Sequence, residues 1–253
     1  MRRLLPLALL LACDPAPSLP EPASEPAPEP TPPAPGPADD DPPPPDPPPV
    51  PGDSPRAPPE GFVDLRIALP TACFTAGYAA ADNFTGAPLP GYAAPGAWML
   101  ADAAAALERV QDSLASADLV LLIFDAYRPR RASEAMVAWA ERTGQRELVE
   151  DGYIARRSGH NHGHTIDLGL ARRGACDPST WLDMGTPWDT LDERSHTANA
   201  TGAARENRAT LLRAMRSAGF RDYTLEWWHF GYPLTGTRAR DVPYGAHEPD
   251  ETP

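Results

Sequence analysis

One short stretch, residues 158–170, constrains the fold more than any other part of the chain. It places three histidines and one aspartate within eight residues, from His160 to Asp167, and then continues as an apolar alternation. Side chains of a strand alternate between its two faces, so this alternation predicts a strand with one buried face. Asp167 then lies on the polar face, and His160 lies in the loop that leads into the strand through Gly163. A carboxylate and an imidazole arranged in this way can converge on one metal ion.

The second half of such a site is offered near the other end of the chain by Glu226 and His229. A catalytic zinc site uses three protein ligands and leaves one position for water, so we expect His160, Asp167 and His229 to bind one Zn²⁺ per chain. Zinc lowers the pKa of bound water to about 7, and a nearby carboxylate can accept the proton that is released. We assign that role to Glu226. Residues 226 and 229 face opposite sides of a regular strand, so we expect a twist or a strand end here.

Arg128 follows a continuous apolar run, residues 118–124, which is typical of a central strand. A guanidinium at the end of such a strand can stabilise the oxyanion of a tetrahedral intermediate. The alternative is an ion-paired strand end before Pro129. A lone histidine or aspartate is likewise more often a hydrogen-bonded structural residue than a ligand.

The remaining histidines have no clear partners in the sequence. His162 and His164 compete with His160 as ligands and stay unassigned, whereas His196 and His247 are assigned to the surface or to structural contacts.

Composition divides the chain into parts. Residues 14–59 hold 22 of the 34 prolines, nine acids and a single base, with almost no large apolar side chains. Such a segment cannot bury enough surface to offset its ordering entropy, so we expect a disordered tether. The rest predicts one domain over residues 60–240 and a C-terminal tail over 241–253. The net charge of −13 argues against a nucleic-acid partner, because no basic stripe is available to displace counterions from phosphates.

The first 13 residues are typical of an exported bacterial lipoprotein. Two arginines precede an apolar run, Leu4–Ala12, that is too short to span a membrane. The following Cys13 completes a sequence that resembles a lipobox, whose cysteine is lipidated. We therefore expect a location in the cell envelope, on the periplasmic side, with the lipid at Cys13 as the only membrane contact. An ordinary secretory signal cleaved near Ala12 is the alternative.

Two other cysteines remain, Cys73 and Cys176. In an oxidising compartment they could form a disulfide, and two separate buried thiols are an equally good interpretation. Neither belongs to a Cys-x-x-Cys pair, which argues against a cysteine zinc site.

Helices and strands follow one another irregularly along the predicted domain. We expect strands over 61–68, 118–124, 165–170 and 223–230, and helices over 98–117, 132–142 and 199–217, with a long irregular segment over 71–96 and a polar connection over 143–157. This order predicts an α+β fold in which helices pack on a small antiparallel or mixed sheet.

The site residues lie within motifs of a known family. Ser158-x-His160-x-x-Gly163-x-Thr165-x-Asp167 resembles the Ser-x-His-x-x-Gly-x-Ala-x-Asp motif of LAS-type zinc D,D-peptidases, and Glu226-x-x-His229 matches their second motif. Within that superfamily the chain most resembles the D-alanyl-D-alanine dipeptidases of vancomycin resistance. The supporting stretches follow the family's order through residues 61–233 and include 82–86, 125–129, 183–186, 192–196 and 225–230.

This resemblance implies the LAS-type fold and a zinc ion held by His160, Asp167 and His229. It implies that Glu226 acts as general base and later protonates the leaving amine, and that Arg128 stabilises the transition state. Ser158 and Asp189 fall at positions that the family uses around the dipeptide, with Asp189 as the partner of its free ammonium group.

The chain also departs from the family pattern. Thr165 replaces the usual alanine, His162 and His164 are additions, and the proline-rich tether has no counterpart. An envelope location would suit recycling of cell-wall dipeptide better than the cytoplasmic removal of precursor dipeptide. Two alternatives stay open: a related carboxypeptidase or endopeptidase acting on peptidoglycan stems, and a non-catalytic, zinc-stabilised wall-binding lipoprotein. The sequence does not predict an oligomeric state.

Overall fold

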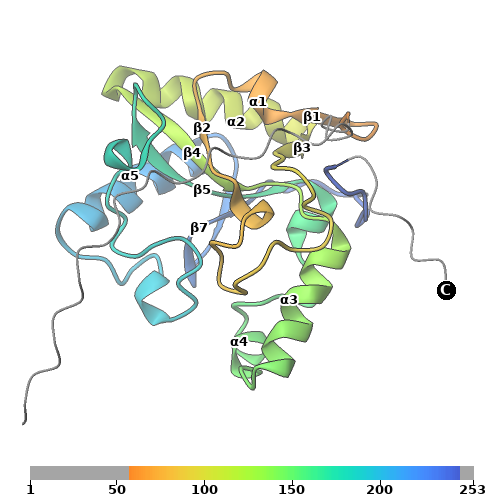
Figure 1. The fold of residues 1–253 in the computed structure, drawn as a ribbon. Helices are drawn as coiled ribbons and strands as arrows, with labels where there is room; N and C mark the ends of the chain where they lie inside the picture. Colours follow the sequence, from red (N-terminus) through yellow and green to blue (C-terminus); the bar gives the residue numbers. More distant parts are fainter. Residues whose placement is uncertain (1–56, 246–253) are drawn as a thin grey trace, which may run out of the picture. The chain divides into compact units, whose positions relative to one another are not determined.

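The computed structural model describes residues 57–245 (Figure 1). The predicted leader, nearly all of the predicted tether and His247 lie outside these residues. The described part contains a two-stranded sheet, in which β1 (Phe62–Asp64) pairs with β3 (Trp98–Leu100), and a larger five-stranded sheet. Helices pack against the larger sheet, which confirms the α+β prediction.

The larger sheet is mixed, and its middle strand carries one of the candidate site residues, Asp167. Its strand order is β2-β4-β5-β7-β6. The β2–β4 pair is parallel and the three other pairs are antiparallel. The bounds are β2 (Cys73–Phe74), β4 (Leu119–Asp125), β5 (Thr165–Arg172), β6 (Arg221–Tyr223) and β7 (Glu226–Gly231).

Two long helices, α2 (Ala101–Leu114) and α5 (Gly202–Ser217), cover one face of this sheet. Their buried side chains join those of the central strands in one apolar cluster, which includes Leu107, Val110, Leu121, Ile123, Leu168, Leu170, Leu211 and Met215. The third long helix, α3 (Arg130–Arg142), packs into a second cluster that is rich in aromatic residues. Shorter elements are α1 (Leu65–Ala68), α4 (Glu147–Glu150) and the 3₁₀ turns η1 (Gly77–Ala79), η2 (Ala115–Ala117), η3 (Gly159–His162), η4 (Pro178–Thr180) and η5 (Glu193–Ser195).

The prediction that β5 has one buried face is wrong, because every residue from Thr165 to Ala171 is buried. The helices cover the face that carries Ile166, Leu168 and Leu170. Long loops cover the other face, so its Thr, Asp and Gly residues are small or polar without being exposed to bulk solvent. The alternation therefore distinguishes the core face from the site face.

Three predicted element bounds also differ from the structure. The strand expected over 61–68 ends at Asp64, because the Asp64 carboxylate accepts a hydrogen bond from the Arg66 amide at 2.9 Å and begins α1. The helix expected over 98–117 begins only at Ala101, since Trp98–Leu100 pairs with β1. The strand expected over 223–230 is a hairpin of two strands, β6 and β7.

The chain stays packed beyond residue 240, where we placed the start of a tail. Tyr244 is buried, and its hydroxyl donates to the carbonyl oxygen of Tyr127 at 2.6 Å. The backbone of Arg240 bonds to both Arg130 and Asn161. The segment 240–244 therefore braces the two loops that carry Arg128 and His160.

A disulfide joins Cys73 to Cys176 across 103 residues, so of the two interpretations left open for these cysteines the disulfide is correct. It ties the outer strand β2 to the loop that follows β5. None of the helices described here is both long enough and apolar enough to cross a lipid bilayer.

Candidate active site

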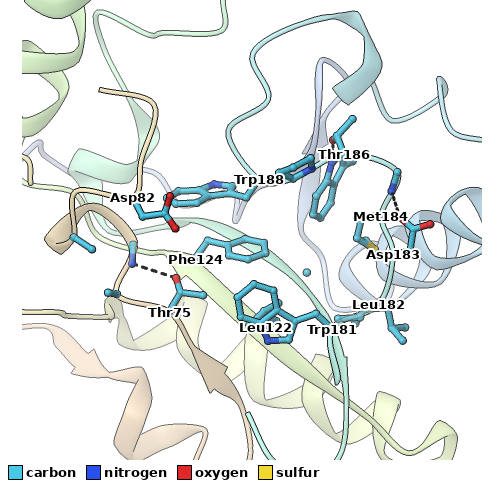
Figure 2. Close-up of a pocket in the computed structure, with 18 residues that line it drawn as sticks. Thr75, Asp82, Leu122, Phe124, Trp181, Leu182, Asp183, Met184, Thr186 and Trp188 are labelled. Atoms are coloured by element: carbon cyan, nitrogen blue, oxygen red, sulfur yellow. Dashed lines mark hydrogen bonds between the residues drawn. The ribbon is translucent and has the colours of Figure 1, made fainter. Parts of the chain in front are cut away.

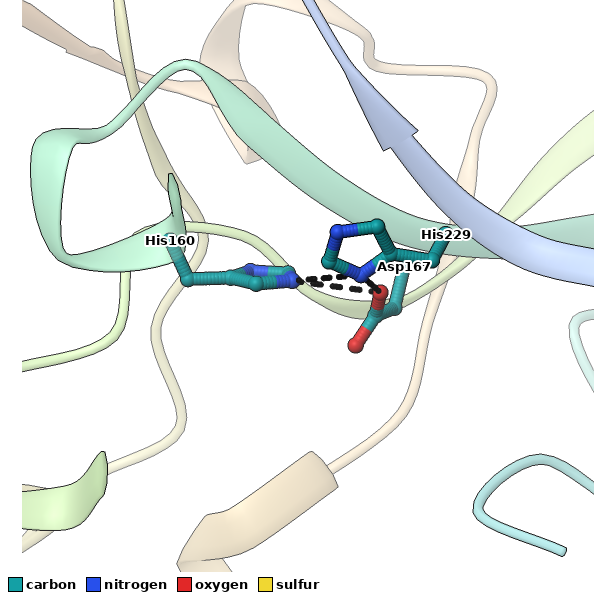
Figure 3. A group of neighbouring side chains, drawn as sticks. All are labelled: His160, Asp167 and His229. Carbon is teal, nitrogen blue, oxygen red and sulfur yellow. Dashed lines mark hydrogen bonds and ion pairs between the residues drawn. The ribbon is translucent and has the colours of Figure 1, made fainter. Parts of the chain in front are cut away.

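Three side chains meet at one end of the central strands (Figure 3). Asp167 of β5 and His229 of β7 are register partners in the antiparallel pair, so their side chains project from the same face of the sheet. His160 reaches them from η3. The distances are 2.9 Å from His229 Nδ1 to Asp167 Oδ1, 3.2 Å from His160 Nε2 to Asp167 Oδ1, and 3.3 Å from His160 Nε2 to His229 Nδ1.

The local backbone fixes the direction of His160. Ser158 caps η3 by accepting a hydrogen bond from the His160 amide at 3.2 Å, and Gly163 ends the turn with a left-handed φ of 77°. His160 Nδ1 lies 2.6 Å from the carbonyl oxygen of Ala126, which can only accept, so Nδ1 carries the hydrogen. The other ring nitrogen, Nε2, is left with its lone pair directed at Asp167 and His229.

This donor set fits a tetrahedral metal ion. Ligand atoms held about 2.0–2.1 Å from zinc in a tetrahedron lie about 3.3 Å from one another, close to the three distances measured. Without a cation, the lone pair of His160 Nε2 would face a carboxylate oxygen. Among the described residues, four carboxylates surround this site, those of Asp125, Asp167, Asp189 and Glu226, and Arg128 is the guanidinium that faces them. The residues present therefore suit a bound cation.

Glu226 lies beside the three converging side chains. Its Oε2 is 3.6 Å from His229 Nδ1, although the two residues are three positions apart in β7. The expected strand end is present: β7 begins at Glu226, and the β6–β7 pairing is irregular at Tyr223. Burial, followed by the charges of Asp167 and Asp189, raises the pKa of Glu226 well above its usual value, against the opposing effect of Arg128.

Arg128 is held by contacts on several sides. Its Nε donates to Asp125 Oδ2 at 2.9 Å, and a second guanidinium nitrogen lies 3.4 Å from Asp167 Oδ2. Its guanidinium carbon also lies 4.9 Å from the centre of the Tyr78 ring, a cation–π distance. These contacts fix the direction of the guanidinium before any ligand arrives.

A pocket of about 240 Å³ opens next to these groups. Six of the seven predicted site residues line it: Arg128, Ser158, Asp167, Asp189, Glu226 and His229. The seventh, His160, is completely buried behind them. The aromatic side chains of Tyr78, Tyr153, Tyr223 and Trp228 complete much of the wall.

Asp189 contributes a carboxylate that is only partly satisfied. Its Oδ1 accepts a hydrogen bond from the Tyr78 hydroxyl at 3.1 Å, whereas its Oδ2 is buried and has no hydrogen-bond partner among the described residues. The residue also has a left-handed φ of 59°, which is uncommon outside glycine and is often found at functional sites. Burial and the neighbouring Asp167 raise the pKa of Asp189 well above its usual value.

The unassigned histidines do not join the group. His162 Nδ1 lies 3.1 Å from Thr237 Oγ1, and His164 Nδ1 lies 3.4 Å from Thr165 Oγ1. His164 precedes β5 and lies three positions from Asp167, an odd separation that places two residues on opposite faces of a strand. His196 has the structural contact we expected, since its Nε2 lies 2.8 Å from the Tyr153 hydroxyl.

Comparison with known proteins identifies the family. A family model described as D-ala-D-ala dipeptidase, of peptidase group M15, matches residues 59–245. Named D-alanyl-D-alanine dipeptidases match as well. The protein from Enterococcus faecalis is 36% identical over 185 residues, which is 67% of this chain and 90% of that protein. The one from Escherichia coli is 34% identical over 173 residues, 68% of this chain and 84% of that protein.

The chain belongs to the D-ala-D-ala dipeptidase family. It is therefore a peptidase, with the α+β fold predicted for that family. Among solved structures, a vancomycin-resistance D,D-dipeptidase in complex with a D-Ala-D-Ala phosphinate analogue matches with a TM-score of 0.36 and 21% identity. That match covers 57% of this chain and 54% of the other.

Three residues of this dipeptidase-family chain gain importance only from the structure. Asp125 lies within 3.4 Å of His160 Nδ1 and bonds Arg128, so one carboxylate orients two site residues. Tyr92 in turn donates to Asp125 at 2.6 Å. The sequence signal for the contact between Asp125 and Arg128 is that they are only three residues apart. Tyr78 lies 111 residues from Asp189, and nothing in the sequence linked the two.

Proposed function

We propose that the protein is a zinc metallopeptidase that hydrolyses the dipeptide D-Ala-D-Ala. The proposal rests above all on the pocket beside His229: possible metal ligands, a buried carboxylate, a guanidinium and an unsatisfied second carboxylate all face the same 240 Å³ space. Membership of the dipeptidase family supports the substrate.

His160, Asp167 and His229 would hold the metal through Nε2, Oδ1 and Nδ1. A bound zinc ion supplies Lewis acidity towards water and towards the scissile carbonyl. The hydrogen bond from His160 Nδ1 to Ala126 keeps the first ring in the tautomer that a ligand needs. Arg128 orients the Asp167 carboxylate, and Asp125 orients the His160 imidazole.

Glu226 moves the proton in this mechanism. Its carboxylate accepts a proton from the attacking water as the new C–O bond forms, and donates it to the amine nitrogen as the C–N bond breaks. The products are two molecules of D-alanine, and Glu226 returns to its starting state. A carboxylate whose pKa is raised by burial suits both halves of this transfer, because it holds a proton more readily than an exposed one.

Arg128 stabilises the negative charge that develops on the carbonyl oxygen. Its guanidinium is positioned by Asp125 before the reaction, so little reorganisation is needed when charge appears. The wall of aromatic side chains excludes water, which strengthens this interaction.

Asp189 and Ser158 bind the substrate on this proposal. The free Oδ2 of Asp189 accepts the ammonium group of the dipeptide, a contact that an internal peptide bond could not make. Ser158 lines the same pocket, and since its oxygen accepts from the His160 amide, its hydroxyl hydrogen stays available to a substrate acceptor.

Incubating the purified full-length protein with D-Ala-D-Ala, and separately with a pentapeptide stem ending in D-Ala-D-Ala, tests this proposal. We expect about one zinc per chain by elemental mass spectrometry and release of D-alanine from the dipeptide. Removal of the metal with a chelator should abolish release, and added zinc should restore it. Cleavage of the stem alone would favour the carboxypeptidase or endopeptidase alternative, and bound zinc without cleavage of either would favour the wall-binding one.

We further propose that the protein is exported and anchored by a lipid at Cys13. The disulfide between Cys73 and Cys176 supports an oxidising compartment. Labelling cells with a radioactive fatty acid, for the natural protein and for Cys13→Ser, tests the anchor. We expect label and membrane association for the first only; equal behaviour of the two would contradict the proposal. In this location the enzyme would recycle dipeptide released from the wall.

A further inference from the structure

A second cavity, of about 650 Å³, lies on the same sheet and belongs to neither the metal site nor its pocket (Figure 2). Its floor comes from β4 and β5, through Leu122, Phe124 and Gly169. Its walls come from the segments 75–82 and 181–188, together with Trp227 of β7. The volume is within the range of small-molecule sites, about 300–1,000 Å³.

Aromatic rings make up much of the lining of this second cavity, which we call the aromatic cavity. Phe124 stacks on Trp188, with ring centres 5.3 Å apart and planes 9° from parallel. The rings of Trp181 and Trp227 meet Phe124 edge-on at 6.5 Å and 6.3 Å. A Cβ atom at Gly169 would lie 3.3 Å from the Phe124 ring, so the ring packs closely over the backbone of β5 at this glycine. Trp181 is 38% exposed, an unusual state for so large an apolar side chain.

The charged groups of the cavity all have one sign. The ionisable side chains that line it are those of Asp82 and Asp183, and no lysine, arginine or histidine lines it. Figure 2 shows the two carboxylates on opposite sides of the aromatic cluster, Asp82 beside Trp188 and Asp183 beside Met184. The Asp183 carboxylate is fixed by the Gly185 amide at 2.7 Å. Arg208 lies behind this wall, with its guanidinium carbon 5.7 Å from the centre of the Trp227 ring, and it interacts electrostatically with Asp183. The side chains that line the cavity carry only negative charge, which favours a cation over an anion.

The cavity offers few polar groups to a neutral ligand. The Trp188 Nε1 donor is buried without a hydrogen-bond partner among the described residues. The Thr186 hydroxyl already accepts from Trp227 Nε1 at 2.9 Å, and the Thr75 hydroxyl accepts from the Gly77 amide at 3.2 Å. Aromatic faces attract cations, and they bind quaternary and other organic ammonium groups when several rings line one space. We propose that the aromatic cavity binds an organic cation, an ammonium group carried on an apolar body about the size of one ring.

This site adjoins the substrate pocket but has its own lining. Trp188 lines the aromatic cavity, while the next residue, Asp189, lines the substrate pocket. Tyr78 lies between them, with its ring 4.8 Å from Trp188 and its hydroxyl bonded to Asp189. Carboxylates lie on both sides of the wall that Trp188 and Tyr78 form, and an ammonium probe has a possible partner in either space. The test must therefore distinguish binding at Asp189 from binding at Asp82 and Asp183.

Isothermal titration calorimetry with three matched probes makes that distinction: 2-phenylethylammonium, the neutral 2-phenylethanol and the anionic 3-phenylpropionate. For the natural full-length protein we expect the ammonium to bind with a Kd of about 1 mM or lower, the alcohol at least about fivefold more weakly, and the carboxylate not at all. Equal binding of the three probes, or no binding of the ammonium at about 10 mM, would overturn the proposal.

Variants locate the bound cation. Asp82→Asn combined with Asp183→Asn should weaken ammonium binding about five- to tenfold, since two partly exposed charges are lost, and Trp181→Ala should weaken it by a similar factor. Asp112→Asn, on the exposed side of α2, is the matched control and should change nothing. Asp189→Asn should also leave the affinity unchanged. Binding lost in Asp189→Asn but kept in the double variant would assign the cation to the substrate pocket and refute the site. Thermal unfolding of each variant confirms that it is folded.

Discussion

The residues around His229 divide into those that would hold a metal and those that would use it. His229 supplies Nδ1 to the group of three possible ligands, and Glu226 stands 3.6 Å behind it without joining that group. Loss of a ligand and loss of a base should therefore have different effects, and two variants of one strand can separate them.

Glu226→Gln should keep the metal and lose most activity. The amide preserves shape and burial but cannot accept a proton, so we expect kcat on D-Ala-D-Ala to fall about 10²–10⁴-fold. His229→Ala should lose metal as well, because two ligands remain. Elemental analysis and steady-state kinetics of both variants are the measurements. Metal-free Glu226→Gln, or a Glu226→Gln enzyme with normal turnover, would contradict the assignment.

Asp189→Asn should weaken substrate binding without affecting metal content. A charge-assisted hydrogen bond contributes about 1.5–3 kcal/mol, so we expect kcat/KM for D-Ala-D-Ala to fall about 10–150-fold. The asparagine keeps an acceptor for the Tyr78 hydroxyl, which limits structural change. As a control, Tyr78→Phe removes only the hydroxyl and should have a smaller effect. An unchanged kcat/KM in Asp189→Asn would rule out the ammonium contact.

At the scale of elements, three short segments are bonded to one another at the mouth of the substrate pocket. The Tyr223 hydroxyl at the end of β6 donates to the Gly152 carbonyl at 3.1 Å, after α4. Tyr153 bonds to His196, just after η5, and the Thr197 amide donates to Thr224 in the hairpin turn. The mouth is thus a ring of loops, and each loop depends on the other two.

Gly152→Ala should break this ring. Gly152 has a φ of 92°, and a Cβ there would lie 2.6 Å from the Tyr223 hydroxyl. Gly144 is the matched control, because its φ is 75° and nothing lies within 4 Å of its Cβ position. We expect each alanine to lower the free energy of unfolding by about 1 kcal/mol for the left-handed backbone, and Gly152→Ala by about 1–2 kcal/mol more.

Denaturant titration of both variants measures the difference. Adding Tyr223→Phe to Gly152→Ala removes the clashing oxygen and should recover part of the loss. Equal destabilisation by the two alanines would show that the Tyr223 contact contributes nothing.

The elements that sequence predicted best are those with a strong local pattern. The apolar run of β4 and the alternation of β5 were identified nearly to their ends, and α3 differs by two residues at its start. Strand β1 was predicted too long and β3 was predicted as the start of a helix. These short strands depend on their pairing with each other, 38 residues apart in the register Phe62↔Leu100, and not on a local sequence pattern. The hairpin between β6 and β7 was also missed, because its turn, Thr224–Leu225, lacks the glycine or asparagine that usually marks such a turn.

The candidate site shows the same contrast between local patterns, which the sequence reveals, and long-range contacts, which it does not. Motif spacing and family resemblance pointed to all seven side chains, and the structure brings six of them to one pocket wall with His160 behind. The supporting contacts of Tyr78 and Tyr92 come from the long irregular segment 71–96, whose path is set by tertiary packing. Spacing along the chain carries no information about such contacts, whereas it does link Asp125 to Arg128.

At the scale of the whole molecule, the disulfide is the covalent link between distant parts of the fold. It closes a loop of 103 residues that contains β4, α3 and all of β5. Replacing both cysteines, Cys73→Ser with Cys176→Ser, should lower the free energy of unfolding by about 2–5 kcal/mol, mainly because the unfolded chain gains freedom. Denaturant titration with and without reductant is the measurement. Reductant should shift the natural protein towards the double variant and leave that variant unchanged; an unaffected natural protein would contradict this account.

The pairing of β5 with β7 also sets the order of events as the chain is made. Asp167 and His229 are 62 residues apart, so at roughly 5–20 residues per second the first is synthesised on the order of seconds before the second. Until β7 joins the sheet, the chain offers one imidazole and one carboxylate, which are two of the three possible metal ligands. On the proposed function, the metal would therefore bind only after β7 docks, in the compartment where that docking takes place.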